Sequence, residues 1–573
     1  MDRGAGETVD EMWGWPRRWL LPLAVTALCM AAGFKLLHIL WWNPRRIEKH
    51  FARQGIRGPP YRFFIGNLRE MVGLMLEASS TPMVPQSSHN ILPRVLSFYH
   101  HWKKIYGSTF LLWFGPTARL AVADPDLIRE IFVSRAEFFD RYESHPLVRK
   151  LEGDGLVSLR GEKWAHHRRV LTPTFHMDNL KLLIPMIGKT VVEMVDKWTA
   201  MSSAAGGGEV EIDVADWFQG VTEDAITRTA FGRSYDDGKA VFRLQAKQMV
   251  FAAEAFRMVL VPGYRFLPTK KNTSSWKLDM DIQRTLVQLI GQRRKEATIV
   301  SEVNKTESAA AAAAVKDLLG LMINATGGGG RRSTAPSTTA SPISVTDIVE
   351  ECKTFFFAGK QTTTNLLTWT TVLLGMHPEW QDRARHEVLL VCGSRDIPSR
   401  DQLSKLKTLG MILNETMRLY PPAVATIRRA KTDVQLGGLN IPQGTELLIP
   451  IMAVHHDTRL WGSDAAQFNP GRFADGVARA AQYPTAFIPF GLGARMCIGQ
   501  NLALLEARLT LALILQRFTF RPSPAYVHAP TVLMLLYPQY GAPILFRPLA
   551  PSSSADGCNA GDLFASRETR SPS

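Results

Sequence analysis

The chain has 573 residues, 46% of them hydrophobic, and carries a formal net charge of +15. This length provides for a sizeable buried core in a globular protein. The five cysteines are few, odd in number and widely spaced, which argues against a disulfide framework and for a reducing compartment. The positive charge indicates contact with an anionic membrane or an acidic protein. No dense Lys/Arg block with interleaved aromatic residues supports nucleic-acid binding.

Residues 19–42 are mostly apolar and predict a membrane-spanning helix, because a bilayer core needs about 20 such residues. A cleaved signal peptide is the alternative, but the run is too long and lacks a clean small-residue cleavage pattern. Basic residues dominate the chain after the span. We therefore expect residues 1–18 in the lumen, a signal anchor at 19–42, and the rest of the chain in the cytosol.

Residues 43–60 are basic and contain Gly55, Gly58, Pro59 and Pro60, which predicts a hinge before a folded domain at 61–550. Inside that domain, the low-complexity stretch 326–342 predicts a disordered surface insertion between two helices. The Ser-rich residues 551–573 predict a disordered tail.

Regular elements are predicted along the domain. Residues 108–123 predict two short strands joined at Gly115–Pro116, and a helix is expected to start at Asp124–Pro125. Residues 161–169 predict a helix with Trp164 and Arg168 on one face. His166 and His167 in the same helix are expected at the surface. Residues 210–294 show helical apolar periods without a recognisable chemical motif.

Residues 346–375 predict one helix about 45 Å long, beginning after Ser344 or Thr346 and ending before Pro378. Its centre reads AGKQTT, residues 358–363. A glycine and successive β-branched residues are poor local choices for a helix interior, and such a conflict is typical of a functional site. Threonines bonding back to the preceding carbonyls would account for the threonines but not for Gly359.

A second motif, FGLGARMCIG, occupies residues 490–499. Its glycines allow close approach of a bulky flat group, and amides at a turn and helix N-terminus favour a thiolate at Cys497. Arg495 can pair with a carboxylate of that group and Phe490 can cover it. This is the arrangement of a thiolate-ligated haem. A core cysteine would not need these neighbours, zinc needs more ligands, and Met496 breaks a dinucleotide fingerprint.

The motif resembles the haem-binding F-x-x-G-x-R-x-C-x-G signature of the cytochrome P-450 family, matched by Phe490, Gly493, Arg495, Cys497 and Gly499. The resemblance implies a mainly α fold with small β-sheets and a haem b cofactor. Cys497 would be the axial ligand of the haem iron.

The resemblance also assigns roles to residues elsewhere. Trp164 and Arg168 would hold one haem propionate, and Arg428 would reach the second. Glu415 and Arg418 form an E-x-x-R pair, a weak signal by itself. With Arg472 they match a structural triad of the family, although Gly471 replaces the glutamate often found before that arginine.

Residues 358–363 resemble the family's oxygen-activation motif. Ala358 and Gly359 would shape a groove beside the haem, and the Thr362 hydroxyl would hold water for proton delivery, with Thr363 beside it. Gln361 departs from the usual acid; because an amide cannot deliver a proton, water and the hydroxyls of Thr362 and Thr363 would carry that role. Residues 424–427 and 533–536 would line the substrate pocket.

The resemblance implies an NADPH- and O2-dependent monooxygenase acting on an apolar substrate in the endoplasmic reticulum membrane. Electrons would come from a separate NADPH–cytochrome reductase, since no flavin or dinucleotide segment is recognisable. A haem-thiolate isomerase or dehydratase is an alternative, but such members tend to lose the threonine found at 362. A non-enzymatic haem sensor would not need residues 358–363.

For the substrate, segments such as LEGDGLVSL (151–159), GEKWAHHRR (161–169) and HAPTVLMLLYPQYGAP (528–543) resemble plant enzymes that inactivate brassinosteroids by hydroxylating the terminal side-chain carbon. The likeness covers residues 55–548, apart from the insertion. Oxidation of a fatty acid, gibberellin, cytokinin or triterpenoid is the alternative.

Overall fold

The computed structural model describes residues 14–83, 88–143, 148–149, 152–232, 235–256, 267–303, 317–325 and 343–549. The predicted insertion at 326–342 and tail at 551–573 lie outside these residues, as does most of the predicted lumenal segment. Helices dominate the described chain and the sheets are small, so the predicted fold class is confirmed.

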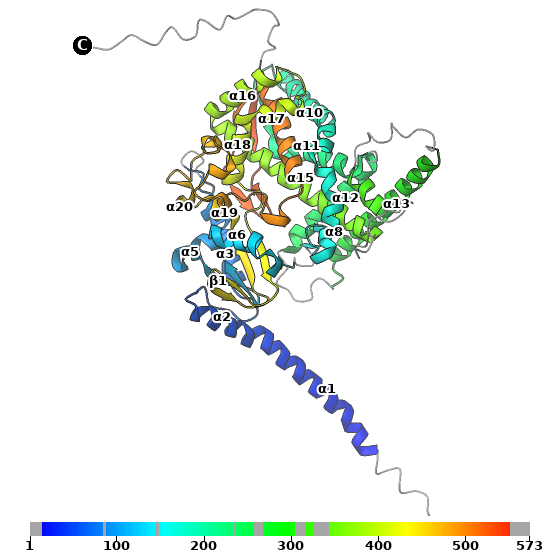
Figure 1. Ribbon diagram of the computed structural model, residues 1–573, viewed down its shortest axis with the longest axis vertical. Helices are drawn as coiled ribbons and strands as arrows, with labels where there is room; N and C mark the ends of the chain where they lie inside the picture. The colour runs from blue at the N-terminus through cyan, green and yellow to red at the C-terminus, as the bar shows by residue number, and fades with distance from the viewer. Residues whose placement is uncertain are drawn as a thin grey trace, which may run out of the picture.

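The N-terminal segment is a long helical rod that extends away from the body (Figure 1). It consists of α1 (Gly14–Leu37), a π-helical stretch (His38–Trp42) and α2 (Asn43–Arg53). Within it, Leu21–Arg53 is long and apolar enough to cross a membrane, with a mean hydropathy of 1.9 in its most apolar window. This fits a single-pass anchor. The basic part of the predicted hinge is itself helical, and the chain turns after it, at Gln54 and Gly55, where Gly55 has a φ of 81°.

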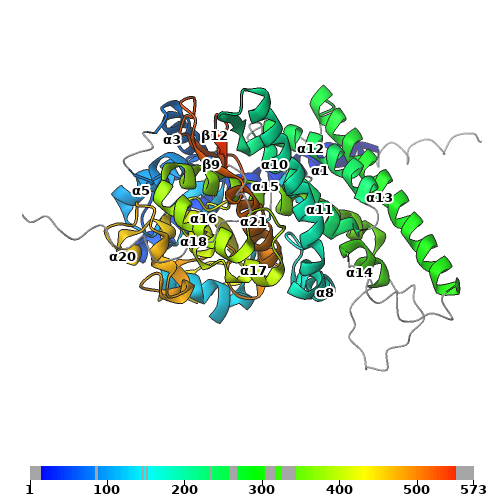
Figure 2. The ribbon, with the colours of Figure 1, turned by 90° about the horizontal axis from the view of Figure 1, so that it is seen from above.

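The centre of the body is α15 (Val345–Met376), which confirms the predicted long helix. Ser344 caps it through a reciprocal pair of hydrogen bonds with Asp347. Around it pack α11 (Val214–Phe231), α18 (Lys407–Leu419) and α21 (Gln500–Leu515), and α10 (Ile184–Ala204) lies outside α11 and α21 (Figure 2). α15 therefore contacts the segment that follows Cys497.

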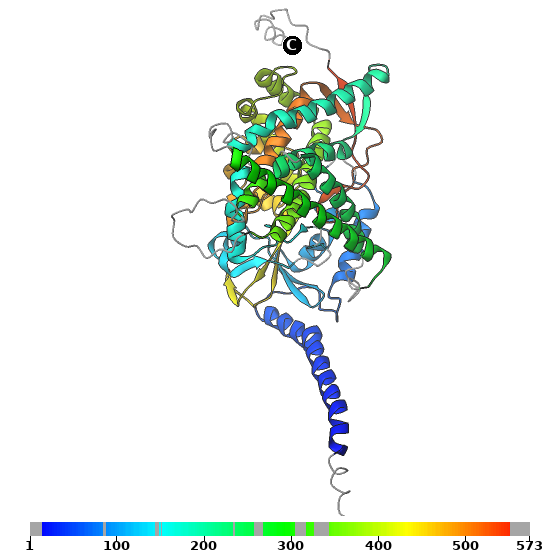
Figure 3. The same cartoon turned by 90° about the vertical axis from the view of Figure 1, so that its right-hand side faces the viewer.

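The largest sheet has the strand order β1-β2-β8-β5-β3. β1 (Phe110–Phe114) and β2 (Thr117–Ala121) form the predicted hairpin, and β2 pairs in parallel with β8 (Glu446–Ile449). β8 pairs with β5 (Thr426–Ala430), which pairs with β3 (Phe139–Arg141). This sheet lies at the end of the body nearest to α2 (Figure 3).

Three smaller sheets complete the β structure of the described residues. They contain β4 (Val210–Asp213), β12 (Pro543–Pro548) and β9 (Phe518–Pro522); β6 (Val434–Leu436) and β7 (Leu439–Ile441); and β10 (Pro530–Val532) and β11 (Leu536–Pro538). The remaining α-helices are α3 (Leu68–Ser80), α4 (Leu92–Val95), α5 (Ser97–Tyr106), α6 (Pro125–Arg129), α8 (Gly161–Leu171), α9 (Met177–Leu180), α12 (Tyr235–Phe256), α13 (Lys270–Val303), α14 (Leu318–Ala325), α16 (Pro378–Cys392), α17 (Arg400–Lys405), α19 (Ile451–His455) and α20 (Thr458–Trp461).

Candidate active site

The loop before α21 is built around glycines. Its one-turn 3-10 helix, Gly493–Arg495, precedes Cys497, whose N–H donates to the carbonyl oxygen of Phe490 over 2.9 Å. Gly491 and Gly493 have φ angles of 76° and 71°, in the region that side chains disfavour. A Cβ on Gly493 would also clash with the carbonyl oxygen of Phe132. The turn therefore requires glycine at this position both for its backbone angle and for its close neighbour.

The Cys497 thiol lies in a mixed environment. The residue is solvent-accessible, yet burial by the surrounding protein raises the pKa of its thiol. Amide hydrogen bonds from Gly499 and Gln500 and the charge of Arg168 lower this pKa and oppose the effect of burial. No group of three or more metal-ligating side chains occurs in the described ranges, so Cys497 fits a single-thiolate ligand better than a zinc cluster.

Arginines from distant segments lie near the Cys497 loop. Burial lowers the pKa of Arg168 and Arg495, and it lowers that of Arg428 to about 9, with repulsion from Arg141 and Arg495 contributing. Among described residues, no carboxylate lies within 4.0 Å of Arg168, Arg428 or Arg495. Partly buried cations without such partners are costly. They fit an anionic group between them, as the two propionates of haem would supply.

Trp164 of α8 completes this arrangement. The guanidinium carbon of Arg495 lies 4.5 Å from the centre of the Trp164 ring, and Arg495 also donates to the carbonyl oxygen of Leu159 over 3.0 Å. The structure thus joins α8 to the Cys497 loop, as the predicted propionate site requires. The contacts of each residue with haem remain predictions.

Phe175 connects the Cys497 loop to α15. Its ring centre is 5.7 Å from that of Phe355, and its edge lies 3.8 Å from where a Cβ on Gly499 would be. Phe355 precedes the AGKQTT segment by one turn. The two motifs found in the sequence therefore belong to one continuous region of the protein.

In the middle of α15, the Thr362 hydroxyl donates to the carbonyl oxygen of Ala358 over 2.6 Å, the back-bond that the sequence left open as an alternative. The Gln361 amide donates to Asn365 over 3.2 Å. Gly359 also has a packing role, and its predicted role in shaping a groove beside the haem stays a prediction. A Cβ there would lie 2.6 Å from Ile226 of α11, so the glycine permits close packing of α11 and α15.

The three residues of the predicted triad lie together in the structure. Arg418 contacts Glu415 at 2.7 Å and 2.8 Å through two nitrogens, and both side chains are fully buried. Arg472 lies 3.4 Å from Glu415 and donates to the carbonyl oxygen of Trp461 over 3.0 Å. Arg418 also bonds the carbonyl of Ala465 over 2.7 Å. The triad ties α18 to the chain that leads towards the Cys497 loop.

One expectation about α8 was wrong. His167 is buried, with its Nδ1 2.6 Å from Oε1 of Glu351. The other carboxylate oxygen of Glu351, Oε2, accepts the N–H of Leu156 over 2.9 Å. The helix faces α15 there, so a histidine that looks solvent-exposed in an otherwise charged stretch is internal. Gly155 approaches so closely that a Cβ would lie 2.5 Å from Glu351. Only the GDG sequence hinted at this contact.

The segments predicted to line the substrate pocket lie near each other. The N–H of Leu536 donates to the carbonyl oxygen of Pro422 over 2.9 Å, which sets residues 533–536 beside the chain that leads into 424–427. Val424 is buried, whereas Ile427 is partly exposed. Their contact with a substrate remains a prediction.

The Cys497 loop and the cluster of buried arginines are joined to the long central helix α15. This arrangement is typical of a protein that binds haem through a thiolate. Comparison with known proteins agrees: the Cytochrome P450 family model matches residues 86–542. The chain belongs to the cytochrome P450 family. This confirms the predicted enzyme class and the haem b cofactor, and members of this family receive electrons from a reductase.

Several curated plant proteins are similar over almost their whole length. Cytochrome P450 734A6 of Oryza sativa subsp. japonica is 70% identical over 94% of this chain and 97% of its own. Cytochrome P450 734A1 of Arabidopsis thaliana is 64% identical over 93% and 98%. Echinocystic acid 23-monooxygenase of Saponaria officinalis is 40% identical over 90% and 96%.

Proposed function

We propose that this monooxygenase hydroxylates the side chain of brassinosteroids and thereby inactivates the hormone. The observation that carries this proposal is the set of segments resembling brassinosteroid-inactivating plant enzymes. One of them, residues 151–159, packs against α15: Glu351 accepts the N–H of Leu156, and Thr354 donates to the carbonyl oxygen of Glu152 over 2.7 Å. A segment that is held against α15 just before residues 358–363 is well placed to shape the pocket of an apolar substrate.

When bound, a thiolate-ligated haem supplies the activation of dioxygen that hydroxylation of an unactivated C–H bond requires. Cys497 would provide the thiolate, aided by the amides of Gly499 and Gln500. Arg168 and Arg428, with Trp164 and Arg495, would orient the group through its propionates. The fixed glycine turn would keep the sulfur in place.

Protons would reach the reacting oxygen through water near Thr362. The Thr362 hydroxyl donates its hydrogen to the carbonyl oxygen of Ala358, so the lone pairs of the hydroxyl oxygen can accept a hydrogen bond from water. Gln361 can hold water but not release a proton. The adjacent Lys360 is paired with Glu223 of α11 over 2.8 Å, and this ion pair orients the lysine towards α11.

The apolar N-terminal helix supports an anchor in the endoplasmic reticulum membrane, with the folded domain in the cytosol. The partner we propose is a membrane-bound NADPH–cytochrome reductase. The net charge of +15 favours an acidic docking face on that partner.

Hydroxylation of a triterpenoid is the second candidate, because one relative, 40% identical, is named for oxidation of echinocystic acid. Fatty acids and gibberellins are further candidates. A ligand-induced Soret titration of the purified full-length protein distinguishes them, using castasterone, echinocystic acid, a gibberellin and lauric acid. Turnover with reductase and NADPH follows.

We expect a high-spin shift and a side-chain hydroxylated steroid with castasterone only. A normal carbonyl spectrum without any shift by castasterone would overturn the steroid assignment and leave the enzyme class intact.

A further inference from the structure

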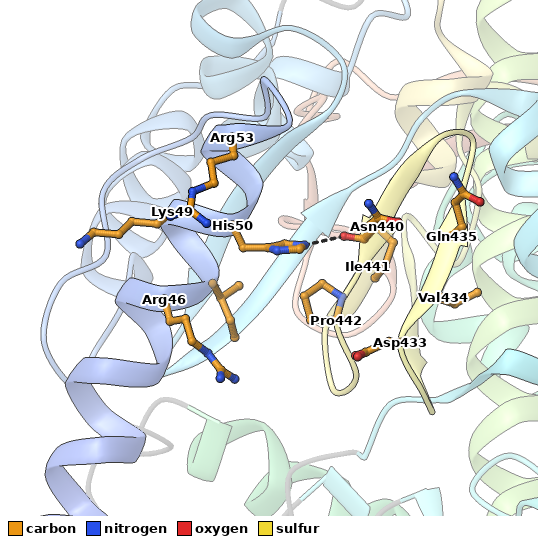
Figure 4. Close-up of a pocket in the computed structure, with 11 residues that line it drawn as sticks. Arg46, Lys49, His50, Arg53, Asp433, Val434, Gln435, Asn440, Ile441 and Pro442 are labelled. Atoms are coloured by element: carbon orange, nitrogen blue, oxygen red, sulfur yellow. Dashed lines mark hydrogen bonds between the residues drawn. The ribbon is translucent and has the colours of Figure 1, made fainter.

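A groove of about 700 Å³ lies between α2 and the β6–β7 hairpin, far along the chain. Arg46, Lys49 and Arg53 line it from α2, and Asp433, Gln435 and Asn440 are among its residues on the hairpin side (Figure 4). This volume lies in the range of small-molecule sites, about 300–1,000 Å³. It is separate from the Cys497 region in sequence and shares no residue with it.

Hydrogen bonds hold the two walls together. His50 reaches from α2 to the carbonyl oxygen of Asn440, 2.8 Å away (Figure 4). Gln54 donates to the same oxygen over 3.1 Å and accepts the N–H of Asn440 over 2.7 Å. The side chains of His50 and Gln54 thus bond the backbone of Asn440 and hold α2 against the hairpin. The groove therefore keeps its shape without a ligand.

The groove carries excess positive charge. Arg46, Lys49 and Arg53 are exposed and have no ion-pair partner among the described residues, and Arg46 bonds only Asn43, at 3.3 Å. By contrast, the neighbouring Arg45 is paired with Glu48 at 2.8 Å. Asp433 is the one carboxylate lining the groove, and it accepts the N–H of Gln443 over 2.7 Å. Arginine binds phosphate oxygens well because its donors form a planar fork.

The position of α2 favours a membrane lipid as the phosphate-bearing ligand of this groove. α2 begins directly after Trp42, at the end of the apolar part of the rod, and connects it to the body (Figure 1). Trp41 and Trp42 are exposed there, 37% and 44%, as is typical of residues at a membrane interface. We propose that this groove binds the phosphate-bearing headgroup of an anionic glycerophospholipid in the leaflet facing the folded domain.

The acyl chains of such a lipid would lie beside α1, and its headgroup would lie between α2 and the hairpin. One lipid molecule would thereby fix the angle between the N-terminal helical rod and the folded body. A soluble phosphate carries a similar charge but has no acyl chains to hold it at the membrane interface. This difference allows an experiment to distinguish a lipid ligand from a soluble one. The proposal concerns anchoring and holds whatever the substrate is.

The test uses full-length holoprotein in phosphatidylcholine nanodiscs with increasing phosphatidylinositol and without reductase. Hydrogen exchange of residues 433–443 reports occupancy of the groove. We expect slower exchange as phosphatidylinositol increases. For Arg46→Gln with Arg53→Gln, we expect half-maximal protection to need about fivefold more lipid for each arginine removed. Asp433→Asn should need less lipid than the wild type, since it removes the groove's own negative charge.

The matched control is Arg57→Gln with Arg69→Gln, which removes the same charge from exposed positions outside the groove. It should behave like the wild type. Equal loss in this control would reduce the effect to general surface charge and overturn the site. Unchanged protection in the groove variants would also overturn it. Protection by inorganic phosphate in pure phosphatidylcholine discs would assign the groove to a soluble anion instead of a lipid.

Discussion

The guanidinium of Arg495 lies over the indole ring of Trp164, its central carbon 4.5 Å from the ring centre. This contact joins a residue two positions before Cys497 to a helix more than three hundred positions earlier. It holds a cation in a half-buried place where burial lowers its pKa. The pair is thus set in position before any anion arrives, which reduces the ordering needed to bind one.

Replacing Trp164 by Leu should weaken this preorganisation. A cation–π contact of this kind contributes about 0.5–2 kcal/mol, so haem should be lost about tenfold faster. Transfer of haem to excess apomyoglobin measures the rate. The control is Trp380→Leu on α16, outside the site. There the guanidinium carbon of Arg383 lies 4.3 Å from the centre of the Trp380 ring, so this variant removes a similar contact. Equal rates in both variants would contradict a role in haem binding.

Replacing Cys497 by Ser should abolish the carbonyl spectrum of the thiolate-ligated form, because a hydroxyl does not replace the sulfur as an anionic ligand at neutral pH. Haem can still enter the site, so the total haem content must be measured beside the spectrum. Cys352→Ser is the control, since that cysteine is buried in α15 and is not part of the loop. A thiolate-type spectrum in Cys497→Ser would show that the ligand is another residue.

Replacing Thr362 by Ala should lower the product formed for each NADPH consumed, while substrate binding remains near the wild-type level. In the proposed function, this hydroxyl holds the water that delivers protons. Thr371→Ala is the matched control, because Thr371 makes the same back-bond to Leu367, 2.9 Å, in the same helix. Coupling that stays unchanged in Thr362→Ala would remove Thr362 from the proton path.

Replacing Glu415 by Gln should destabilise the fold strongly. It leaves Arg418 buried with its charge unpaired, and breaking such a pair costs about 3–5 kcal/mol. The expected results are poor haem incorporation and a lower thermal midpoint. Asp281→Asn, which breaks an exposed pair with Arg284, should cost about 1 kcal/mol or less. A comparable loss in the two variants would contradict the structural role of the triad.

Acid should destabilise the folded domain through its buried histidines. Burial lowers the pKa of His89, His455 and His456 from 6.5 to about 3, and that of His528 to about 4. The unfolded state therefore takes up protons that the folded state does not. Stability from this source is complete above about pH 6.5 and falls towards pH 3, by about 1.4 kcal/mol per pH unit for each histidine.

The thermal midpoint of the holoprotein between pH 7.5 and 5 measures this loss. His89 is the residue to change, because its Nδ1 lies 2.9 Å from the Tyr420 hydroxyl, which in turn lies 3.1 Å from His528. His89→Gln should lower the midpoint at neutral pH yet flatten its fall in acid. A fall as steep as in the wild type would mean that other groups govern the acid response.

Local patterns in the chain were enough to predict several parts of this structure. The length of the apolar span, the strands around Gly115 and the capped helix after Ser344 all depend on interactions between residues close in sequence. The glycine loop around Cys497 is also local, because its φ angles and its cysteine lie within ten residues. These local features alone indicate the family and its cofactor.

Only the tertiary structure decided how distant segments meet. Nothing local predicts that His167 pairs with Glu351, that Gly359 packs closely on Ile226, or that Arg141 joins the cluster of cations. The groove between α2 and the hairpin likewise needs segments almost four hundred residues apart. Periodicity and spacing reflect interactions between residues close in sequence, so the sequence predicts local elements. Contacts between distant residues depend on the topology of the fold, which forms only when the whole chain packs.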